Sequence, residues 1–368
     1  MTKNHQLLKR ITVLILAVLL ALPAAGCNPL SKIKGWGARA LEKQQRKAVL
    51  IGLCMDTLQE ERWQKDRDMF VARAQELGAQ VLVTEAAGDD ELQNKQADNL
   101  ITQGVDVLVV VPHNGVTAAS IVEKAHKAGI KVIAYDRLIN DSDPDLYISF
   151  DGERVGFLQA DYLLKKQPTG NYVWLAGAPT DFNAHLFRKG NERALKPYIE
   201  RGDIKVVFDD WVEDWKPENA RRLMENALTR NNDNVQAVVA PNDGTAGGII
   251  QALKSRNLAG KVLVSGQDAD LAACQRVVEG VQAMTVYKPI HALSRAAAEI
   301  TVAVARGEDI SSRINNAVNN KKIDVPSVLI PPIQVDIDNM METVIKDGFH
   351  AFEDVYRNVP FDQRPPKP

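Results

Sequence analysis

The sequence predicts an α/β protein with two doubly wound parallel-sheet lobes joined by three chain crossovers. Short, continuously apolar segments alternate with amphipathic segments at a spacing of roughly 25–30 residues. The alternation begins at Ala48 and starts again after Asp151. A continuous apolar run is typical of a strand buried on both faces, as in a parallel sheet. With 368 residues, the chain is long enough for two lobes, each with its own core.

Residues 1–26 are expected to be an export signal (signal peptide). The first ten residues carry Lys and Arg but no acid, and residues 11–25 form an uncharged apolar run. This run is short for a membrane-spanning helix, which needs about 20 apolar residues. Small residues lead up to Cys27, which resembles a bacterial lipoprotein signal in which the cysteine is lipidated. We therefore expect a lipid anchor on Cys27 and a polar tether over 27–47. The alternative is ordinary cleavage, with Cys27 removed or free.

The first half of the remaining chain alternates predicted strands and helices. The strands are expected at 48–54, 80–84, 105–111 and 130–135. The helices are expected at 61–77, 91–103 and 117–128. Glycines directly after the first and third helix indicate where these helices end. This order favours a parallel sheet covered by helices.

The second half repeats the pattern. Helices are expected at 153–165, 186–199 and 217–229, the last with a proline in its first turn. Strands are expected at 171–177, 204–209, 235–240, 261–266 and 281–287. No shorter repeat typical of a solenoid is present in the sequence. Two α/β lobes therefore explain the whole pattern.

The C-terminal part of the chain is expected to cross back between the lobes. An alanine-rich helix over 291–306 is followed by a loop rich in Asn and Lys, and then by an extended proline-containing segment over 325–335. Prolines suit a crossover better than a central strand because they cannot donate a backbone hydrogen bond. Hinges are expected near 147–151, 286–289 and 329–333. The N-terminal lobe would then hold 48–148 plus 288–329, and the C-terminal lobe 149–287 plus 330–368.

Composition and motifs exclude several classes of function. Lys and Arg number 45 and Asp and Glu 47, a net charge of -2, which argues against a nucleic-acid binder driven by bulk charge. The three cysteines are far apart and form neither a disulfide scaffold nor a zinc pair, so Cys54 and Cys274 are expected to be buried free thiols. Phosphate-loop, HExxH and GxSxG motifs are missing from the sequence, and the acidic stretch 141–145 is expected to be a solvated turn. No cofactor, metal or catalytic residue is therefore expected.

Polar side chains follow nearly every predicted strand. In open α/β sheets, ligands bind beyond the carboxyl ends of the strands, so these residues are candidates for one site. The candidate ligand-binding residues are Arg62, Trp63, Asp136, Arg137, Asp181, Asn183, Trp215, Asn242, Asp268 and Lys288. Each has a structural alternative: an acid after a strand is often a helix N-cap, Asp136 and Arg137 could form a local salt bridge, and Trp63 could be a core aromatic.

These residue types suit a neutral sugar. Acids and amide oxygens accept hydrogen bonds from hydroxyl groups, whereas Arg, Lys and amide nitrogens donate to the hydroxyl oxygens. Three acids and three bases among the candidates cancel in charge, which favours a monosaccharide over a sugar acid or phosphate. Trp63 and Trp215, one in each half, could pack on the two apolar faces of a sugar ring.

Eight long strings spread over residues 48–350 carry a resemblance to a known family. They are ERWQKDRD (61–68), GVDVLVVVPHNG (104–115), AYDRLINDSDPDLYISFD (134–151), WVEDWKPENA (211–220), NDGTAGG (242–248), SGQDADLA (265–272), MTVYKPI (284–290) and VIKDGFH (344–350). Together they resemble the pentose- and hexose-binding type of periplasmic binding proteins of ABC transporters, in particular those that bind D-xylose.

The resemblance implies a type I fold of two lobes that enclose a sugar, and the family's sugar contacts match the ten candidate residues. It also implies a monomeric, non-enzymatic receptor in the periplasm that delivers D-xylose or a similar monosaccharide to a membrane permease and its ATPase. The expected anchor on Cys27 departs from the usual soluble member of this type. The segment 352–368 also departs from the family, and no function is expected for it.

Three other functions fit parts of the sequence. A sensory receptor could present the same sugar-bound form to a chemoreceptor or a sensor kinase. A glycosidase could use two of the acids as its catalytic pair. A sugar-responsive transcription regulator could share the fold, but an export signal stands where a DNA-binding helix-turn-helix would be expected.

Overall fold

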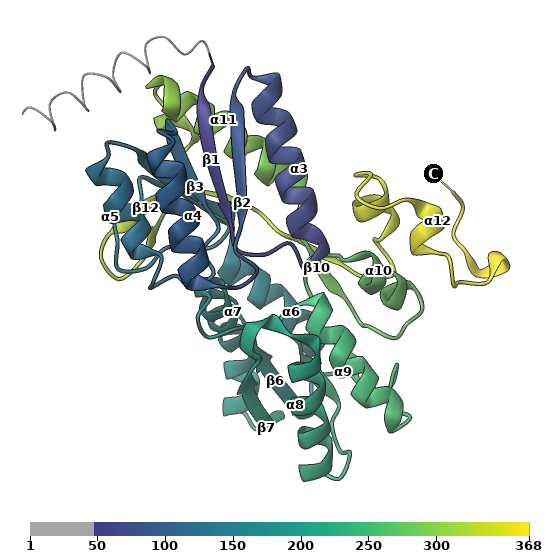
Figure 1. Cartoon of the computed structure of the whole chain (residues 1–368). Helices are drawn as coiled ribbons and strands as arrows, with labels where there is room; N and C mark the ends of the chain where they lie inside the picture. Colours follow the sequence, from purple (N-terminus) through teal and green to yellow (C-terminus); the bar gives the residue numbers. More distant parts are fainter. Residues whose placement is uncertain (1–47, 368) are drawn as a thin grey trace, which may run out of the picture. The chain divides into compact units, whose positions relative to one another are not determined.

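Two parallel β-sheets, each with helices on both faces, organise the chain (Figure 1). The computed structural model describes residues 48–367; the expected export signal, tether and Cys27 lie outside them. Within residues 48–367, the larger sheet has seven strands and the smaller has four. One pair at the edge of the larger sheet, β11 with β12, is antiparallel. The predicted α/β class with doubly wound parallel sheets is confirmed.

The larger sheet has the strand order β11-β12-β5-β4-β3-β1-β2. Its strands are β1 (Leu50–Met55), β2 (Gln80–Glu85), β3 (Val107–Val110), β4 (Lys131–Tyr135), β5 (Leu146–Phe150), β11 (Asn316–Asn319) and β12 (Asp324–Ile330). Helices α3 (Glu61–Glu76) and α11 (Ile290–Arg306) pack on one face. Helices α4 (Asp90–Thr102) and α5 (Ala119–Lys127) pack on the other. Alternate strand residues point to opposite faces, so each face has its own apolar layer.

The smaller sheet has the order β7-β6-β8-β9. Its strands are β6 (Gly170–Ala176), β7 (Ile204–Trp211), β8 (Ala237–Val239) and β9 (Leu263–Val264). Helices α8 (Pro217–Arg230) and α9 (Asp243–Ser255) cover one face. Helices α6 (Gly152–Lys166) and α7 (Phe182–Glu200) cover the other. Strands β8 and β9 are shorter than the apolar runs that predicted them.

The chain connects the elements of the two sheets in three places. Strand β5 leads into α6 through Asp151, whose side chain accepts a hydrogen bond from the Arg154 amide and so caps the helix. Strand β10 (Thr285–Tyr287) continues the smaller sheet, since Val286 exchanges backbone hydrogen bonds with Gly266 and Asp268. It leads into α11 through Lys288 and Pro289. Strand β12 leads through two prolines into β13 (Ile333–Val335), which pairs with β10.

The structure corrects three details of the C-terminal and crossover segments. The proline-containing segment expected to be a crossover begins as β12, a strand inside the larger sheet. Pro326 fits there because pairing with β5 begins only at Ser327, so its missing amide removes no bond on that side. The expected Asn/Lys loop contains the edge strand β11. The segment expected as the first hinge is β5, so the larger sheet extends slightly past the boundaries expected at residues 148 and 329.

The segment after β13 packs against the side of the smaller sheet. A turn of π-helix (Met341–Ile345) and α12 (Phe352–Val355) share an apolar cluster with α10 (Leu271–Val278). Figure 1 shows this yellow segment beside α10. Within residues 48–367, no helix is both long and apolar enough to cross a membrane.

Helix α3 also contacts this C-terminal segment and the start of α10. Lys65 Nζ donates to the Phe349 carbonyl oxygen at 3.3 Å and lies 4.0 Å from the centre of the Phe349 ring. The Leu271 amide donates to Glu61 Oε2 at 3.2 Å. A helix of the larger sheet is therefore tied to elements beside the smaller sheet.

Two smaller sequence predictions are confirmed. Cys54 and Cys274 are free and buried, and burial raises the pKa of the Cys54 thiol to about 11. In the acidic turn, Asp141 and Asp143 are exposed, although Ser142 between them is buried.

The closest helix packing in the smaller-sheet lobe depends on glycine. A Cβ at Gly156 of α6 would lie 1.8 Å from the Phe187 carbonyl oxygen of α7. We expect Gly156→Ala to push the helices apart and cost about 1–3 kcal/mol of unfolding free energy or more. Gly247→Ala on α9 is the control, because its nearest neighbour is the Arg276 side chain at 3.5 Å. Denaturant unfolding should show a loss only for Gly156→Ala; equal stabilities would contradict this packing.

Candidate functional site

All ten residues predicted from the strand ends line one small cavity between the two sheets. The space between these side chains is about 340 Å³, part of which is open to solvent. The ten are Arg62, Trp63, Asp136, Arg137, Asp181, Asn183, Trp215, Asn242, Asp268 and Lys288. All are buried except Trp215, which is partly exposed. The structure therefore brings together side chains that are up to about 225 positions apart in the sequence.

Each side chain reaches the cavity from the end of a strand or the start of a helix. Arg62 and Trp63 stand in the first turn of α3. Asp136 and Arg137 directly follow β4, and Lys288 directly follows β10. The other five come from the loops and helix starts of the smaller-sheet lobe: Asp181, Asn183, Trp215, Asn242 and Asp268.

Two of these residues are helix N-caps as well as cavity residues. Asp181 Oδ1 accepts from the Asn183 amide at 2.9 Å at the start of α7. Asn242 and Thr245 form a capping box at the start of α9. The capping alternative raised by the sequence therefore holds for both, and the cap fixes each side chain at the edge of the cavity.

Arg62 is the most enclosed cation of the site. Its Nη2 donates to Asp136 Oδ2 at 2.7 Å and its Nε to Asp66 Oδ2 at 3.1 Å. Its Nη1 lies 3.7 Å from Asp268 Oδ1, across the cavity. Burial alone would lower its pKa, but Asp136 and Asp66 outweigh burial and hold it well above the ordinary value. The guanidinium thus stays charged among carboxylates from both lobes.

Arg137 forms a second ionic contact between the lobes. Its Nη1 donates to Asp56 Oδ2 at 2.6 Å, and its Nε lies 2.9 Å from Asp181 Oδ2. Burial raises the pKa of Asp181, and the charge of Arg137 works against that rise. Burial also favours the neutral form of Asp56, but His113 and Arg137 hold its pKa below the ordinary value.

Asp136 is contacted from every side. Besides Arg62, the Asn183 amide donates to its Oδ1 at 3.1 Å and to its backbone oxygen at 2.9 Å. The Tyr147 hydroxyl donates to the same backbone oxygen at 2.9 Å. Burial opposes the charge of Asp136, but Arg62 and Lys288 overcome it and lower the pKa. Asp136 and Arg137 therefore pair with residues farther away along the chain rather than forming the local salt bridge that was the structural alternative.

Lys288 pairs with the acid on the smaller-sheet side. Its Nζ lies 2.7 Å from Asp268 Oδ1, and both side chains are at most 8% exposed. Each of the three predicted bases is thus matched by one of the three predicted acids. The pairs are Arg62–Asp136, Arg137–Asp181 and Lys288–Asp268.

The two predicted tryptophans reach the cavity from opposite lobes. The guanidinium of Arg62 lies 4.2 Å from the centre of the Trp63 ring, and the guanidinium of Arg137 lies 5.2 Å from it. Trp215 lies edge-on to Phe187, with ring centres 6.3 Å apart. Gly177 makes room for Trp215, since a Cβ there would lie 2.0 Å from the indole.

Three cavity residues have a left-handed backbone that side chains rarely adopt. The φ angles are 60° at Asp136, 58° at Trp215 and 100° at Asp268. None of the three is a glycine, and such conformations cost of order 1–3 kcal/mol each. Surrounding contacts must hold them in place, and this kind of strain clusters at ligand sites.

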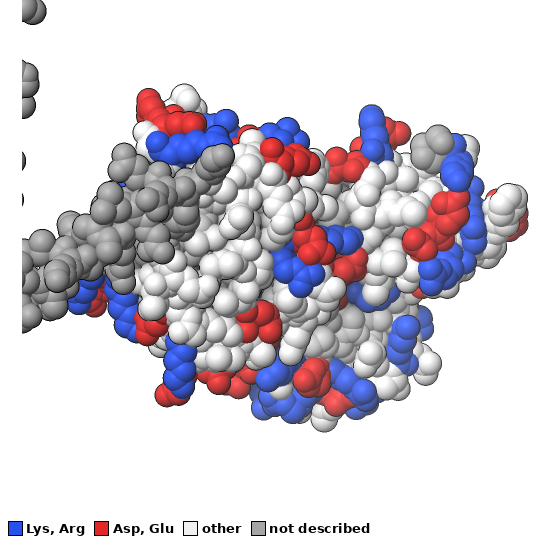
Figure 2. All heavy atoms as spheres, turned by 45° about the horizontal axis from the view of Figure 1, so that its top comes forward, with Lys and Arg blue, Asp and Glu red and all other residues white. Residues whose placement is uncertain are grey.

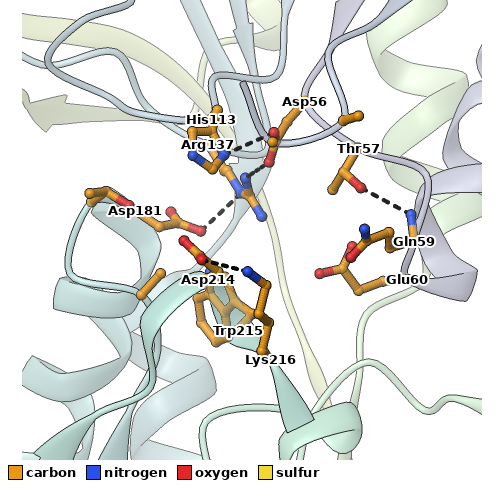
Figure 3. A pocket seen from close by; sticks show the side chains of 14 residues that line it. Asp56, Thr57, Gln59, Glu60, His113, Arg137, Asp181, Asp214, Trp215 and Lys216 are labelled. Carbon is orange, nitrogen blue, oxygen red and sulfur yellow. Dashed lines mark hydrogen bonds and ion pairs between the residues drawn. The ribbon is translucent and has the colours of Figure 1, made fainter. Parts of the chain in front are cut away.

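A wider space adjoins the cavity on one side. It has about 600 Å³ of empty volume and shares four residues with the cavity: Glu60, Arg137, Asp181 and Trp215. Figure 3 shows Arg137 between Asp56 and Asp181, with His113 beside Asp56 and Trp215 below. The Arg137–Asp181 ion pair therefore stands between the cavity and this outer space.

The comparisons with known proteins agree with this geometry. A family model described as a periplasmic binding protein domain matches residues 51–309. The chain belongs to the periplasmic binding protein family. Two relatives from Escherichia coli K12 and Haemophilus influenzae, both named D-xylose-binding periplasmic protein, are 54% identical to this member. The alignments cover 83% and 84% of this chain, and 92% and 93% of the relatives.

Solved structures of this family show the same fold. A carbohydrate transporter solute-binding protein from Chloroflexus aurantiacus, in complex with D-glucose, has a TM-score of 0.78 at 32% identity. A transporter solute-binding protein from Clostridium phytofermentans with bound β-D-glucose has a TM-score of 0.77 at 28% identity. They cover 84% and 83% of this periplasmic binding protein, and 98% and 99% of their own chains. The type I periplasmic binding protein fold is therefore confirmed.

The strand-end reasoning missed three residues that line the cavity. They are Glu60, Phe187 and Gln267. Gln267 directly precedes Asp268 and could have been found from that position, whereas Phe187 lies within α7 and carried no signal. Glu60 adds a fourth acid to the three expected, and burial raises its pKa, which favours its neutral form.

Figure 2 shows acidic and basic side chains interspersed on one face, without a large patch of one sign. Among residues 48–367, no group of three or more His, Cys, Asp or Glu residues is arranged to hold a metal ion.

His113 is expected to make the stability of this member depend on pH. Its Nδ1 lies 2.9 Å from Asp56 Oδ1, and this hydrogen bond raises the pKa of His113 above 6.5. The stabilisation is therefore complete below about pH 6.5 and fades as the pH rises through the folded pKa. We expect His113→Gln to lower the Tm more in acid than in alkaline solution. Thermal unfolding between about pH 5.5 and 9 tests this, and a constant Tm difference would contradict it.

Proposed function

We propose that this protein binds D-xylose in the cavity and delivers it to the permease of an ABC importer. The observation that carries the proposal is the convergence of ten polar and aromatic side chains from both lobes on one small, nearly charge-balanced cavity. The two relatives with 54% identity are named for D-xylose, and the two solved structures hold D-glucose. The side chains that line the cavity leave little space between them, which suits one monosaccharide better than an oligosaccharide.

The site offers both hydrogen-bond acceptors and hydrogen-bond donors to the hydroxyl groups of a pentose. Asp136, Asp268 and amide oxygens accept protons, whereas Arg62, Lys288 and amide nitrogens donate to oxygens. Hydrogen bonds to charged groups are roughly twice as strong as neutral ones. Because acids and bases are already paired with each other, binding adds no unbalanced charge to the buried site.

Enclosure requires the lobes to move. We take residues 48–150 plus 288–330 as one lobe and 151–287 plus 331–367 as the other, with hinges at the three connections. The sugar enters when the Arg137–Asp181 pair opens and is buried when it closes. The closed form then differs in shape from the empty form, which lets a permease distinguish them. A chemoreceptor or sensor kinase could read the same difference and remains the second candidate.

The cavity supports binding rather than hydrolysis. A glycosidase needs one protonated acid to serve the leaving group and one free carboxylate. Glu60, whose raised pKa favours the neutral form, could supply the protonated acid. However, Asp136, Asp181 and Asp268 each lie within 2.9 Å of a basic group, so none of these three is a free carboxylate. We therefore propose a non-enzymatic, monomeric receptor without a cofactor.

The ligand is tested directly by calorimetry. D-Xylose should bind more tightly than ribose, arabinose, glucose and galactose, because the two relatives with 54% identity are named for it. Xylonate and xylose phosphate serve as charged controls and should bind more weakly than D-xylose, since the cavity offers no excess of cations. Preference for either anion would refute a neutral sugar as the ligand.

Asp136 is expected to dominate the affinity. Asp136→Asn keeps the size and tolerates the left-handed backbone, but it removes the charge that faces Arg62. A buried group left without its partner costs about 1–3 kcal/mol, so D-xylose affinity should fall at least roughly tenfold. Asp143→Asn, in the same loop but exposed and paired with Lys322, should bind as wild type. Equal affinities in the two variants would place the ligand elsewhere.

We also propose export to the periplasm and anchoring there through a lipid on Cys27. The relatives are named as periplasmic, and small residues precede Cys27 as in a lipoprotein signal. Mass spectrometry of the mature protein should find Cys27 as a lipidated N-terminus. An unmodified N-terminus downstream of Cys27 would rule the anchor out.

A further inference from the structure

A carboxylate outside the cavity fixes the orientation of Arg62. Asp66 follows Arg62 by one turn of α3, is 1% exposed and does not line the cavity. Its Oδ2 accepts from Arg62 Nε at 3.1 Å. The two Nη groups of the guanidinium then point to Asp136 and Asp268, both of which line the cavity.

The other oxygen of Asp66 joins two further elements. Its Oδ1 accepts from the Tyr135 hydroxyl and lies 3.4 Å from Ser294 Oγ, and these two hydroxyls are 3.0 Å apart. Tyr135 is the last residue of β4, and Ser294 is in the first turns of α11. The side chains of Asp66, Tyr135 and Ser294 are each at most 2% exposed.

The three elements that meet at Asp66 carry half of the predicted site. Helix α3, the end of β4 and the crossover into α11 supply Arg62, Trp63, Asp136, Arg137 and Lys288. Burial raises the pKa of Asp66, and the positive charge of Arg62 works against that rise. The network is thus a buried, fully connected set of polar groups, which is costly to leave partly satisfied.

We propose that Asp66 is a positioning residue that decides which sugar hydroxyl Arg62 contacts. This rests on the proposed sugar-binding function. A guanidinium is planar, and its N–H donors point in fixed directions relative to one another. The hydrogen bond from Nε to Asp66 therefore also fixes the directions in which the two Nη groups donate. Tyr135 and Ser294 hold the carboxylate in turn. Asp66 therefore acts on specificity without touching the sugar.

Asp66→Asn is the variant that tests the network. Arg62 and Tyr135 donate to different oxygens of Asp66, and the amide replaces one of these oxygens with an NH2 group, so only one of the two donors keeps its acceptor. We expect D-xylose affinity to fall roughly tenfold by calorimetry, with the fold retained by circular dichroism. Asp145→Asn is the matched control, because Asp145 also bridges two partners in this lobe, the Val132 amide and His126, but does not line the cavity. It should leave affinity unchanged.

A panel of monodeoxy analogues of xylose separates positioning from general destabilisation. If Asp66 acts through Arg62, one analogue should lack the hydroxyl that Arg62 contacts, and the Asp66→Asn variant and the wild type should bind this analogue with almost equal affinity. For the other analogues, the variant should still bind about tenfold more weakly than the wild type. A loss that is uniform over all analogues, or no loss for D-xylose, would overturn the inference. Failure of the wild type to bind any of these sugars would instead refute the proposed function.

Discussion

The buried guanidinium of Arg62 is the constraint around which the site is built. A charge taken out of water is tolerated only when partners surround it, and removing one partner costs more than the pair contributes. Arg62 has carboxylates on each of its nitrogens: Asp66 behind it, Asp136 beside it and Asp268 across the cavity. Since Asp268 belongs to the other lobe, the electrostatic demand of one side chain favours the approach of the two sheets.

Two of the three strained backbone positions at the cavity also face Arg62. Asp136 and Asp268 both have positive φ, and both carry a carboxylate that faces Arg62. Hydrogen bonds from Tyr147, Ser149 and Asn183 to the Asp136 backbone oxygen hold its conformation. Rigid placement of this kind lowers the conformational entropy lost when a ligand is ordered. The contacts of the folded protein thus hold these side chains in place before a ligand binds.

Much of this site could be predicted from the sequence because parallel sheets put their carboxyl ends together. Polar residues after apolar runs, such as Asp136 after 130–135 and Lys288 after 281–287, were therefore placed without knowledge of contacts. What could not be predicted depends on pairing between distant segments. The prolines of β12 predict a crossover rather than a central strand, and only its register with β5 shows that Pro326 precedes that pairing. Nothing in the sequence distinguishes Asp66 from other charged residues on a helix, because its partners Tyr135 and Ser294 come from distant segments.

The position of β12 has a consequence for how the chain is made. Strand β5 is flanked on one side by β4 and on the other by β12, which lies about 180 residues later. Until the ribosome has passed residue 330, β5 remains an edge with unpaired backbone groups. The larger sheet therefore stays incomplete through most of synthesis, and such late, non-local pairing slows folding. Slow completion of this lobe keeps the nascent polypeptide open for longer, which suits the export to the periplasm that we propose.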